Sequence, residues 1–114
     1  MPVVSMAMPL LPGKEAEAKK FAAEVSGPRA AEFAEFQTGM GTTRETWHLQ
    51  QTPDGTMLIV WFEDPDPEKA FEHLATASDD FAKWFRGRIQ DVTGADMSEP
   101  QEGPPPETLL DWSA

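Results

Sequence analysis

The first forty residues change from a strand pattern to a helix pattern. Residues 14–25 place their apolar side chains on one helical stripe, and a second helical stretch runs over 30–36 until Gly39 and Gly41 interrupt it. Ahead of them, Pro12-Gly13 ends a segment with a period of two, which is typical of a strand. The large side chains of that first strand are Val4, Met6, Met8 and Leu10.

Two β-rich stretches, 42–52 and 56–64, flank the tripeptide Pro53-Asp54-Gly55. This tripeptide is typical of a type I turn followed by a glycine in the left-handed conformation, so the pattern predicts a hairpin. The turn type fixes the register, and a different turn shifts every pair. With Thr52 opposite Thr56, the expected pairs are Trp47 with Trp61, His48 with Val60 and Glu45 with Glu63, with Arg44 near Asp64.

Two more helices follow the hairpin. Asp66 is suited to cap a helix that begins at Pro67, and a stronger apolar stripe after Ser78-Asp79 predicts a last helix that Gly94 ends. We expect one domain, in which residues 1–98 form the body, the proline-rich residues 99–106 form a connector, and residues 107–114 add a C-terminal strand. The predicted class is α+β, with an antiparallel sheet, the order βαββαβ and the helices on one face.

The strand over 56–64 is apolar on both faces. Ile59 and Trp61 alternate with Val60 and Phe62, so this strand needs cover on each side. In a βαββαβ unit the helices cover only one side of the sheet. The other face is most simply covered by the same face of a second copy, and the pattern therefore predicts a homodimer through the sheet face.

Composition narrows the chemistry of this 114-residue chain. It has no cysteine, which excludes disulfides, thiolate metal sites and a thiol nucleophile. Its net charge of −11 opposes binding to nucleic acid, and it has no apolar run of about 18 residues that would span a membrane. Without a basic leader or a signal cleavage site at its start, the chain is expected to be cytoplasmic.

The passage from strand to helix resembles the dimeric α+β barrel superfamily, which is ferredoxin-like and includes antibiotic-biosynthesis-monooxygenase-like domains. The match covers about 25 residues and is shared by several activities. The fuller pattern resembles bacterial members of this group that carry no assigned reaction. The residues that carry the resemblance are Val60-Trp61-Phe62-Glu63, Ala70-Phe71-Glu72-His73-Leu74 and Phe81, together with Pro12-Gly13-Lys14, Trp47-His48-Leu49-Gln50, Pro53-Asp54-Gly55 and Trp84-Phe85.

The resemblance implies oxygenase chemistry only in part. Cofactor-free monooxygenases and haem-degrading members of the superfamily generally use an asparagine together with a tryptophan or histidine near the substrate. This chain has no asparagine and no tyrosine. Only its tryptophans and histidines fit that pattern, so the sequence does not decide whether the protein is an enzyme.

Candidate site residues follow from the expected strand faces. In the favoured register Glu45 and Glu63 share a face with Trp47 and Trp61, and two close carboxyl groups suit proton transfer. Equally, these tryptophans fit a helix-covered core and the glutamates fit solvated strand ends. His48 and Arg44 face the other way, toward a cavity or a dimer contact. The candidates for catalysis are His48, Glu63 and His73, and those for ligand binding are Trp47, Trp61, Arg44, Trp84 and Phe81.

Three functions remain open from the sequence. The first is a small-molecule enzyme of the monooxygenase or isomerase kind, the second binds a small apolar molecule without turnover, and the third is a structural dimer without a ligand. We predict no cofactor. The spacing of the acidic residues does not match a calcium loop, and with two histidines we predict no metal site. A cavity beside the tryptophans would separate the first two functions from the third.

Overall fold

Three antiparallel strands and four helices form an α+β fold in the part of the chain that the computed structural model describes, residues 2–100 and 103–114. The strands lie in the order β1-β3-β2, so the last strand of the hairpin is central. The observed order is β1-α1-α2-β2-β3-α3-α4, so the described residues lack the final strand of the predicted βαββαβ order. The strands are β1 (Val3–Pro9), β2 (Arg44–Thr52) and β3 (Gly55–Glu63), and the helices are α1 (Glu15–Ser26), α2 (Ala30–Met40), α3 (Pro67–Thr76) and α4 (Asp80–Thr93).

The hairpin between β2 and β3 is confirmed, but its predicted register is wrong by one residue. Thr52 pairs with Gly55 and not with Thr56. Gly55 has a φ of 129°, which glycine adopts without strain, and it takes a place in the ladder. Every further pair of the hairpin is shifted by one residue as well. The observed pairs are Trp47 with Val60, His48 with Ile59, Thr46 with Trp61, Glu45 with Phe62 and Arg44 with Glu63.

The shifted register separates two residue pairs that the sequence placed together. Successive side chains of a strand point to opposite faces. Because Glu45 and Trp47 now lie opposite Phe62 and Val60, they share the face of those buried residues. Trp61 and Glu63 lie on the other face, so the expected pairing of the two glutamates does not occur.

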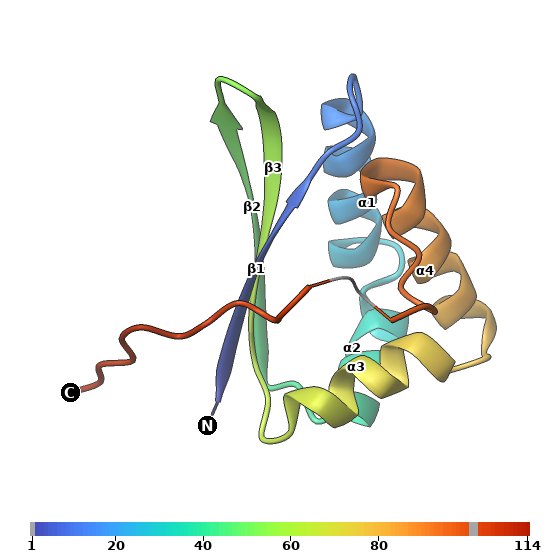
Figure 1. Ribbon diagram of the computed structural model, residues 1–114. Helices are drawn as coiled ribbons and strands as arrows, with labels where there is room; N and C mark the ends of the chain where they lie inside the picture. The colour runs from blue at the N-terminus through green and yellow to red at the C-terminus, as the bar shows by residue number, and fades with distance from the viewer. Residues whose placement is uncertain (1, 101–102) are drawn as a thin grey trace.

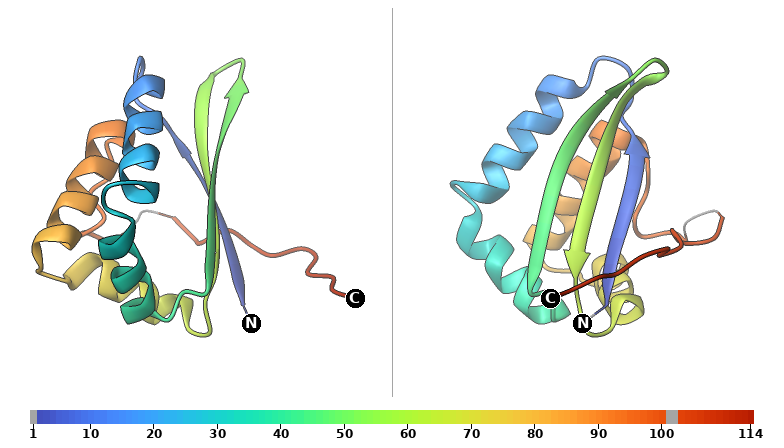
Figure 2. Two further views of the ribbon diagram at one scale, coloured as in Figure 1. Left: turned by 180° about the vertical axis from the view of Figure 1, so that it is seen from behind. Right: turned by 90° about the vertical axis from the view of Figure 1, so that its left-hand side faces the viewer.

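All four helices cover one face of the sheet, and the other face carries none (Figures 1 and 2). On β3 the helix side is buried, with Leu58, Val60 and Phe62 only 7%, 7% and 6% exposed. On the side without helices, Ile59 and Trp61 are only partly buried. We call this second side the open face.

Helices α3 and α4 begin at the capping residues that the sequence indicates, and α4 ends at the predicted glycine. The Asp66 carboxylate accepts a hydrogen bond from the Lys69 backbone N–H at 3.2 Å at the start of α3, and Asp79 caps α4 in the same way. Gly94 ends α4 with a φ of 77°, in the left-handed region. These three caps confirm the predicted boundaries.

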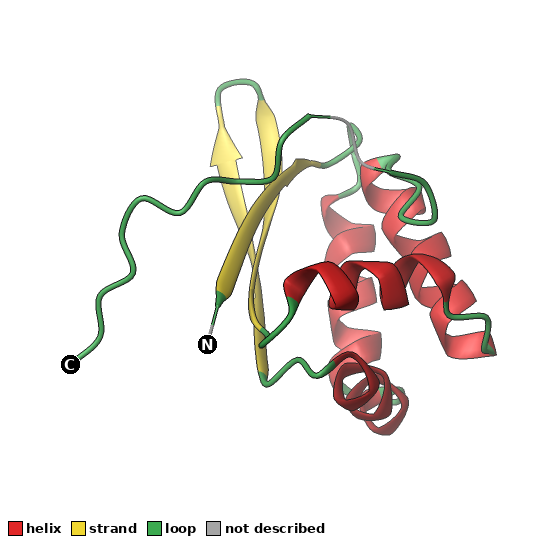
Figure 3. Cartoon of the chain, turned by 60° about the horizontal axis from the view of Figure 1, so that its bottom comes forward, coloured by secondary structure: helices red, strands yellow, loops and turns green. Residues whose placement is uncertain are grey.

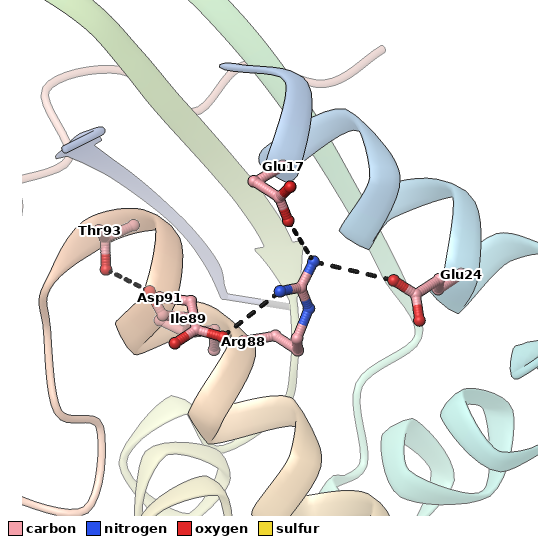
Figure 4. A network of polar contacts seen from close by, with 6 residues as sticks. All are labelled: Glu17, Glu24, Arg88, Ile89, Asp91 and Thr93. Carbon is pink, nitrogen blue, oxygen red and sulfur yellow. Dashed lines mark hydrogen bonds and ion pairs between the residues drawn. The ribbon is translucent and has the colours of Figure 1, made fainter. Parts of the chain in front are cut away.

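Arg88 joins α1 to α4 across the outer helix layer (Figure 4). Its Nη2 lies 3.4 Å from a carboxylate oxygen of Glu17 and 3.8 Å from one of Glu24, both on α1. Its Nη1 lies 3.3 Å from Asp91, one turn along its own helix. The guanidinium also lies 5.8 Å from the centre of the Phe21 ring, so the charge network sits directly over the core.

The C-terminal segment does not form the expected strand within a single chain. Residues 103–114 have no helix or strand and are exposed throughout, and Figure 3 shows them as one extended loop leading away from the domain. The expected connector, 99–106, falls partly outside the described residues. No helix in the described part of the chain is long and apolar enough to cross a membrane.

Candidate functional site: a partly buried carboxyl in an apolar cavity

A cavity of about 60 Å³ lies between the helix-covered face of the sheet and the helices. Almost all of its lining is apolar, and among the described residues Glu45 is the one ionisable residue in its wall. The lining residues are Met6, Met8, Phe21, Gln37, Met40, Thr42, Glu45, Trp47, Leu58, Val60, Phe62, Ala70, Phe71, Leu74, Phe85, Ile89 and Met97.

The Glu45 carboxyl group is held by two side chains. The indole Nε1–H of Trp47 donates to Oε2 at 2.6 Å, and the amide Nε2–H of Gln37 donates to Oε1 at 3.1 Å. Burial raises the pKa of Glu45 above the ordinary value of 4.5, and the hydrogen bonds from Trp47 and Gln37 partly oppose that rise. The group is therefore fixed in place, and its protonated form is favoured more than that of an exposed glutamate.

Local structure explains how a glutamate comes to lie inside. Glu45 and Trp47 are two residues apart on β2, so both point to the helix-covered face. The Trp47 ring is in turn packed against Phe21 on α1 and Phe85 on α4, with ring centres 5.1 and 6.0 Å apart. Gln37 reaches the carboxyl from the last turn of α2, which continues beyond the predicted end at residue 36.

The size of the cavity limits its occupant. A buried water needs roughly 10–15 Å³ of such space, so a volume of about 60 Å³ accommodates about four to six water-sized groups. Beside it, a larger groove of about 630 Å³ runs between β1, α3 and residues 97–100 and 103–106. Cavity and groove share five wall residues, so the groove adjoins the cavity. The shared residues are Met6, Met8, Phe71, Leu74 and Met97.

Four of the predicted site residues lie on the open face, away from this cavity. The Arg44 guanidinium lies 5.5 Å from the centre of the Trp61 ring, and Glu63 accepts a hydrogen bond from the Thr43 hydroxyl at 2.7 Å. His48 is exposed and pairs with Ile59 on β3. Of the predicted ligand-binding residues, only Trp47 lines the cavity.

The remaining predicted residues lie in the helix layer. Phe81 and Trp84 pack with ring centres 5.6 Å apart, and the Arg29 guanidinium lies 4.1 Å from the centre of the Trp84 ring. The His73 ring packs at a tilt beside Phe36 and lines a separate surface depression. The three candidate catalytic residues therefore do not converge, because His48 and Glu63 face the open side whereas His73 belongs to α3.

The described residues contain no group of three or more histidine or acidic residues close enough to hold a metal ion. Comparison of the chain with protein-family models, curated proteins and solved structures found no match. The resemblance to the dimeric α+β barrel superfamily therefore stays a prediction. The site rests on the geometry around Glu45.

Sequence reasoning missed Gln37 and misplaced Glu45. Glu45 was considered only as a partner of Glu63, and the register that paired them is wrong. Gln37 carries no signal of its own, since a polar residue near a helix end is most often solvated. The available signal was Gly41, which ends α2 in the left-handed conformation with a φ of 87° and so places Gln37 within the helix.

Proposed function

We propose that this protein binds a small, mainly apolar molecule in the cavity beside Glu45. The observation that carries the proposal is one hydrogen-bonded carboxyl in a wall that is mainly apolar. Ligand sites commonly combine an apolar lining with a few fixed polar groups that orient the ligand. A structural dimer with a filled core has no need of this space or of a partly buried carboxyl group within it.

The chemistry of Glu45 favours a neutral ligand that carries one oxygen. Both carboxyl oxygens already accept a hydrogen bond, one from Trp47 and one from Gln37. In its protonated form the carboxyl has one further proton to donate, and no hydrogen bond among the described residues uses that proton. A hydroxyl or carbonyl oxygen accepts that proton, and the apolar walls then contact the rest of the molecule. A short-chain alcohol or ketone meets both requirements and the size limit.

The indole signals of the four tryptophans provide a test. In ¹H–¹⁵N spectra, isobutanol is expected to shift the Nε1–H signal of Trp47 in a saturable way, because this group donates to Glu45. The signal of Trp112, in the exposed tail, serves as an internal control. Xenon, which enters apolar cavities without hydrogen bonding, should shift Trp47 as well.

Two variants separate cavity binding from nonspecific contact. Val60→Ile adds one methylene to the wall and should weaken both isobutanol and xenon, whereas Val3→Ile adds the same group on the open face and should change neither. Glu45→Gln should weaken the binding of isobutanol and leave the binding of xenon unchanged. If isobutanol and xenon move all four indole signals alike, without saturation, the proposal is wrong.

We further propose that the open face binds a second copy of the chain. Ile59 and Trp61 form a partly exposed apolar strip along β3, and all helices lie on the other side. Two copies related by a twofold axis would cover each strip with its equivalent. Light scattering during size-exclusion chromatography should give the mass of a dimer at micromolar concentration. Trp61→Ser should shift it toward a monomer, whereas Trp84→Ser, on the helix side, should not.

A further inference from the structure

The C-terminal tail carries three large apolar side chains in full contact with water. Leu109, Leu110 and Trp112 are 88%, 83% and 78% exposed. Clustered exposure of this kind marks an interaction segment, since soluble chains seldom expose several large apolar residues together. The tail therefore needs a surface to cover it.

One edge of the sheet offers unused backbone hydrogen-bonding groups. The Asp64 N–H donates to the carbonyl of Pro2 at 3.1 Å, and the Leu10 N–H donates to the carbonyl of Thr56 at 2.9 Å. In an antiparallel ladder, alternate residues turn their N–H and C=O toward the partner strand, so the even-numbered residues of β1 face β3. The odd-numbered residues turn theirs to the outer edge, where no strand of the described residues lies. Those with both groups available are Val3, Ser5 and Ala7.

The outer edge of β1 lacks the usual protection against strand addition. Natural edge strands carry charges or prolines that prevent pairing, but β1 has no charged residue, and its only proline, Pro9, is at its end. The other edge strand, β2, carries Arg44 and Glu45. The β1 edge also borders the apolar groove beside the cavity. It is therefore the better acceptor for a further strand.

The tail has the pattern of the strand that this edge lacks. In an extended conformation Thr108, Leu110 and Trp112 point one way, while Leu109 points the other way between Glu107 and Asp111. The first set suits the groove, whose walls include Met6, Met8 and Leu74. Residues 107–112 are one residue shorter than β1, which has seven.

The direction of the tail indicates whose edge it meets. Figure 1 and the right-hand view of Figure 2 show it passing β1 and then projecting from the open side, away from its own sheet. Pro104-Pro105-Pro106 stiffens the approach, and residues 107–114 contain no glycine, proline or asparagine that would turn the chain back. The twelve residues from Gly103 onward reach up to about 40 Å when extended, which is enough to cross an open-face contact.

We propose that residues 107–112 of one copy pair as a fourth strand with the free edge of β1 in a second copy, and that the exchange is reciprocal. Leu110 and Trp112 then fill the groove of that copy, which adjoins its cavity. The inference rests on the proposed self-association, and it adds that each binding site is completed by the partner subunit.

Paramagnetic labelling of mixed copies tests this directly, because the chain has no cysteine of its own. A Ser113→Cys chain without ¹⁵N that carries a nitroxide is mixed with ¹⁵N-labelled wild-type chain. The total concentration is kept above the dimer dissociation constant. We expect the amide signals of Val3, Ser5 and Ala7 to broaden. Because nitroxide and ¹⁵N are on different chains, this broadening reports only contacts between chains. A nitroxide at Lys20→Cys, on the exposed side of α1, should leave these signals sharp.

The outcomes are distinct. A second sample carries the nitroxide and ¹⁵N in the same Ser113→Cys chain. If these amides broaden only in this second sample, the tail folds onto its own edge and the proposal is wrong. It is also wrong if neither experiment broadens them, even where light scattering still shows an open-face dimer. Replacing Leu110 and Trp112 by serine should abolish the broadening and raise the dimer dissociation constant at least about tenfold. A Glu107→Gln variant, whose apolar tail residues are intact, should keep the broadening and the dimer dissociation constant of the wild type.

Discussion

The indole N–H of Trp47 donates to the carboxyl group of Glu45 at 2.6 Å, between two residues of the same strand that both point into the core. One side chain thus packs the aromatic core with its ring and fixes with its nitrogen the only ionisable group that the described residues contribute to the cavity wall. Stability and the candidate site are coupled through this residue.

Trp47→Phe separates these two roles. Phenylalanine retains aromatic packing against Phe21 and Phe85 but removes the donor, so the pKa of Glu45 should rise further. Loss of the hydrogen bond and of part of the ring should cost about 1–3 kcal/mol of unfolding free energy. Urea denaturation and a ¹³C titration of Glu45 measure the two effects.

Trp84→Phe is the matched control, since Trp84 lies in the helix layer under Arg29 and does not touch Glu45. It should leave the titration of Glu45 unchanged. An unaltered pKa of Glu45 in Trp47→Phe would contradict the assigned hydrogen bond.

Glu45 should make stability depend on pH in the direction opposite to a paired carboxylate. Because its pKa is raised in the folded state, the folded chain binds the proton more tightly than the unfolded chain. Its contribution is complete below the ordinary value of 4.5 and is lost as the pH rises through the raised pKa. The unfolding free energy of the wild type minus that of Glu45→Gln should therefore fall with rising pH. Urea denaturation at several pH values measures this difference, and a constant or rising difference would rule the shift out.

Asp64 should stabilise the passage from β3 to α3. It is fully buried and accepts hydrogen bonds from the Thr42 hydroxyl at 2.9 Å and from the Asp66 backbone N–H at 2.8 Å. Asp64→Ala leaves both donors without this acceptor and should cost about 1–3 kcal/mol. Thr42→Val removes one donor and should cost less. Equal stability of Asp64→Ala and the wild type in thermal unfolding would contradict this role.

Arg88→Met should loosen the contact between α1 and α4. Methionine retains part of the apolar stem but loses the contacts with Glu17 and Glu24. Because those carboxylates are partly exposed, the expected loss is modest, about 0.5–1 kcal/mol, and it should shrink in high salt. Lys20→Met removes one positive charge from α1 outside this network and serves as the control in denaturant unfolding. A loss independent of salt would show that packing, not charge, dominates.

Salt should strengthen the proposed self-association. Each copy carries a net charge of −11, so two copies repel one another while the proposed contact is apolar. Screening is stronger at 300 mM than at 20 mM sodium chloride, and the dimer dissociation constant from sedimentation should fall between these concentrations. A constant that rises with salt would indicate an interface held by ion pairs.

The sequence alone determined the elements, because their signals are local. Asp66 and Asp79 cap helices through their own side chains, Gly94 ends a helix through its freedom to adopt positive φ, and Pro53-Asp54 turns the hairpin. Each needs only a few neighbouring residues. The first three predicted strands and the helices are therefore close to those observed, whereas the last predicted strand, over 107–114, does not form in the described residues.

The tertiary structure decided the register of β2 on β3 and with it the site. Since β3 is apolar on both faces, its pattern fits either register, and a shift of one residue moves every side chain to the other face. The register is selected by the packing of the helices on Leu58, Val60 and Phe62, while β1 pairs along the other edge of β3. That choice placed Glu45 and Trp47 together inside, and it left Trp61 and Glu63 on the open face.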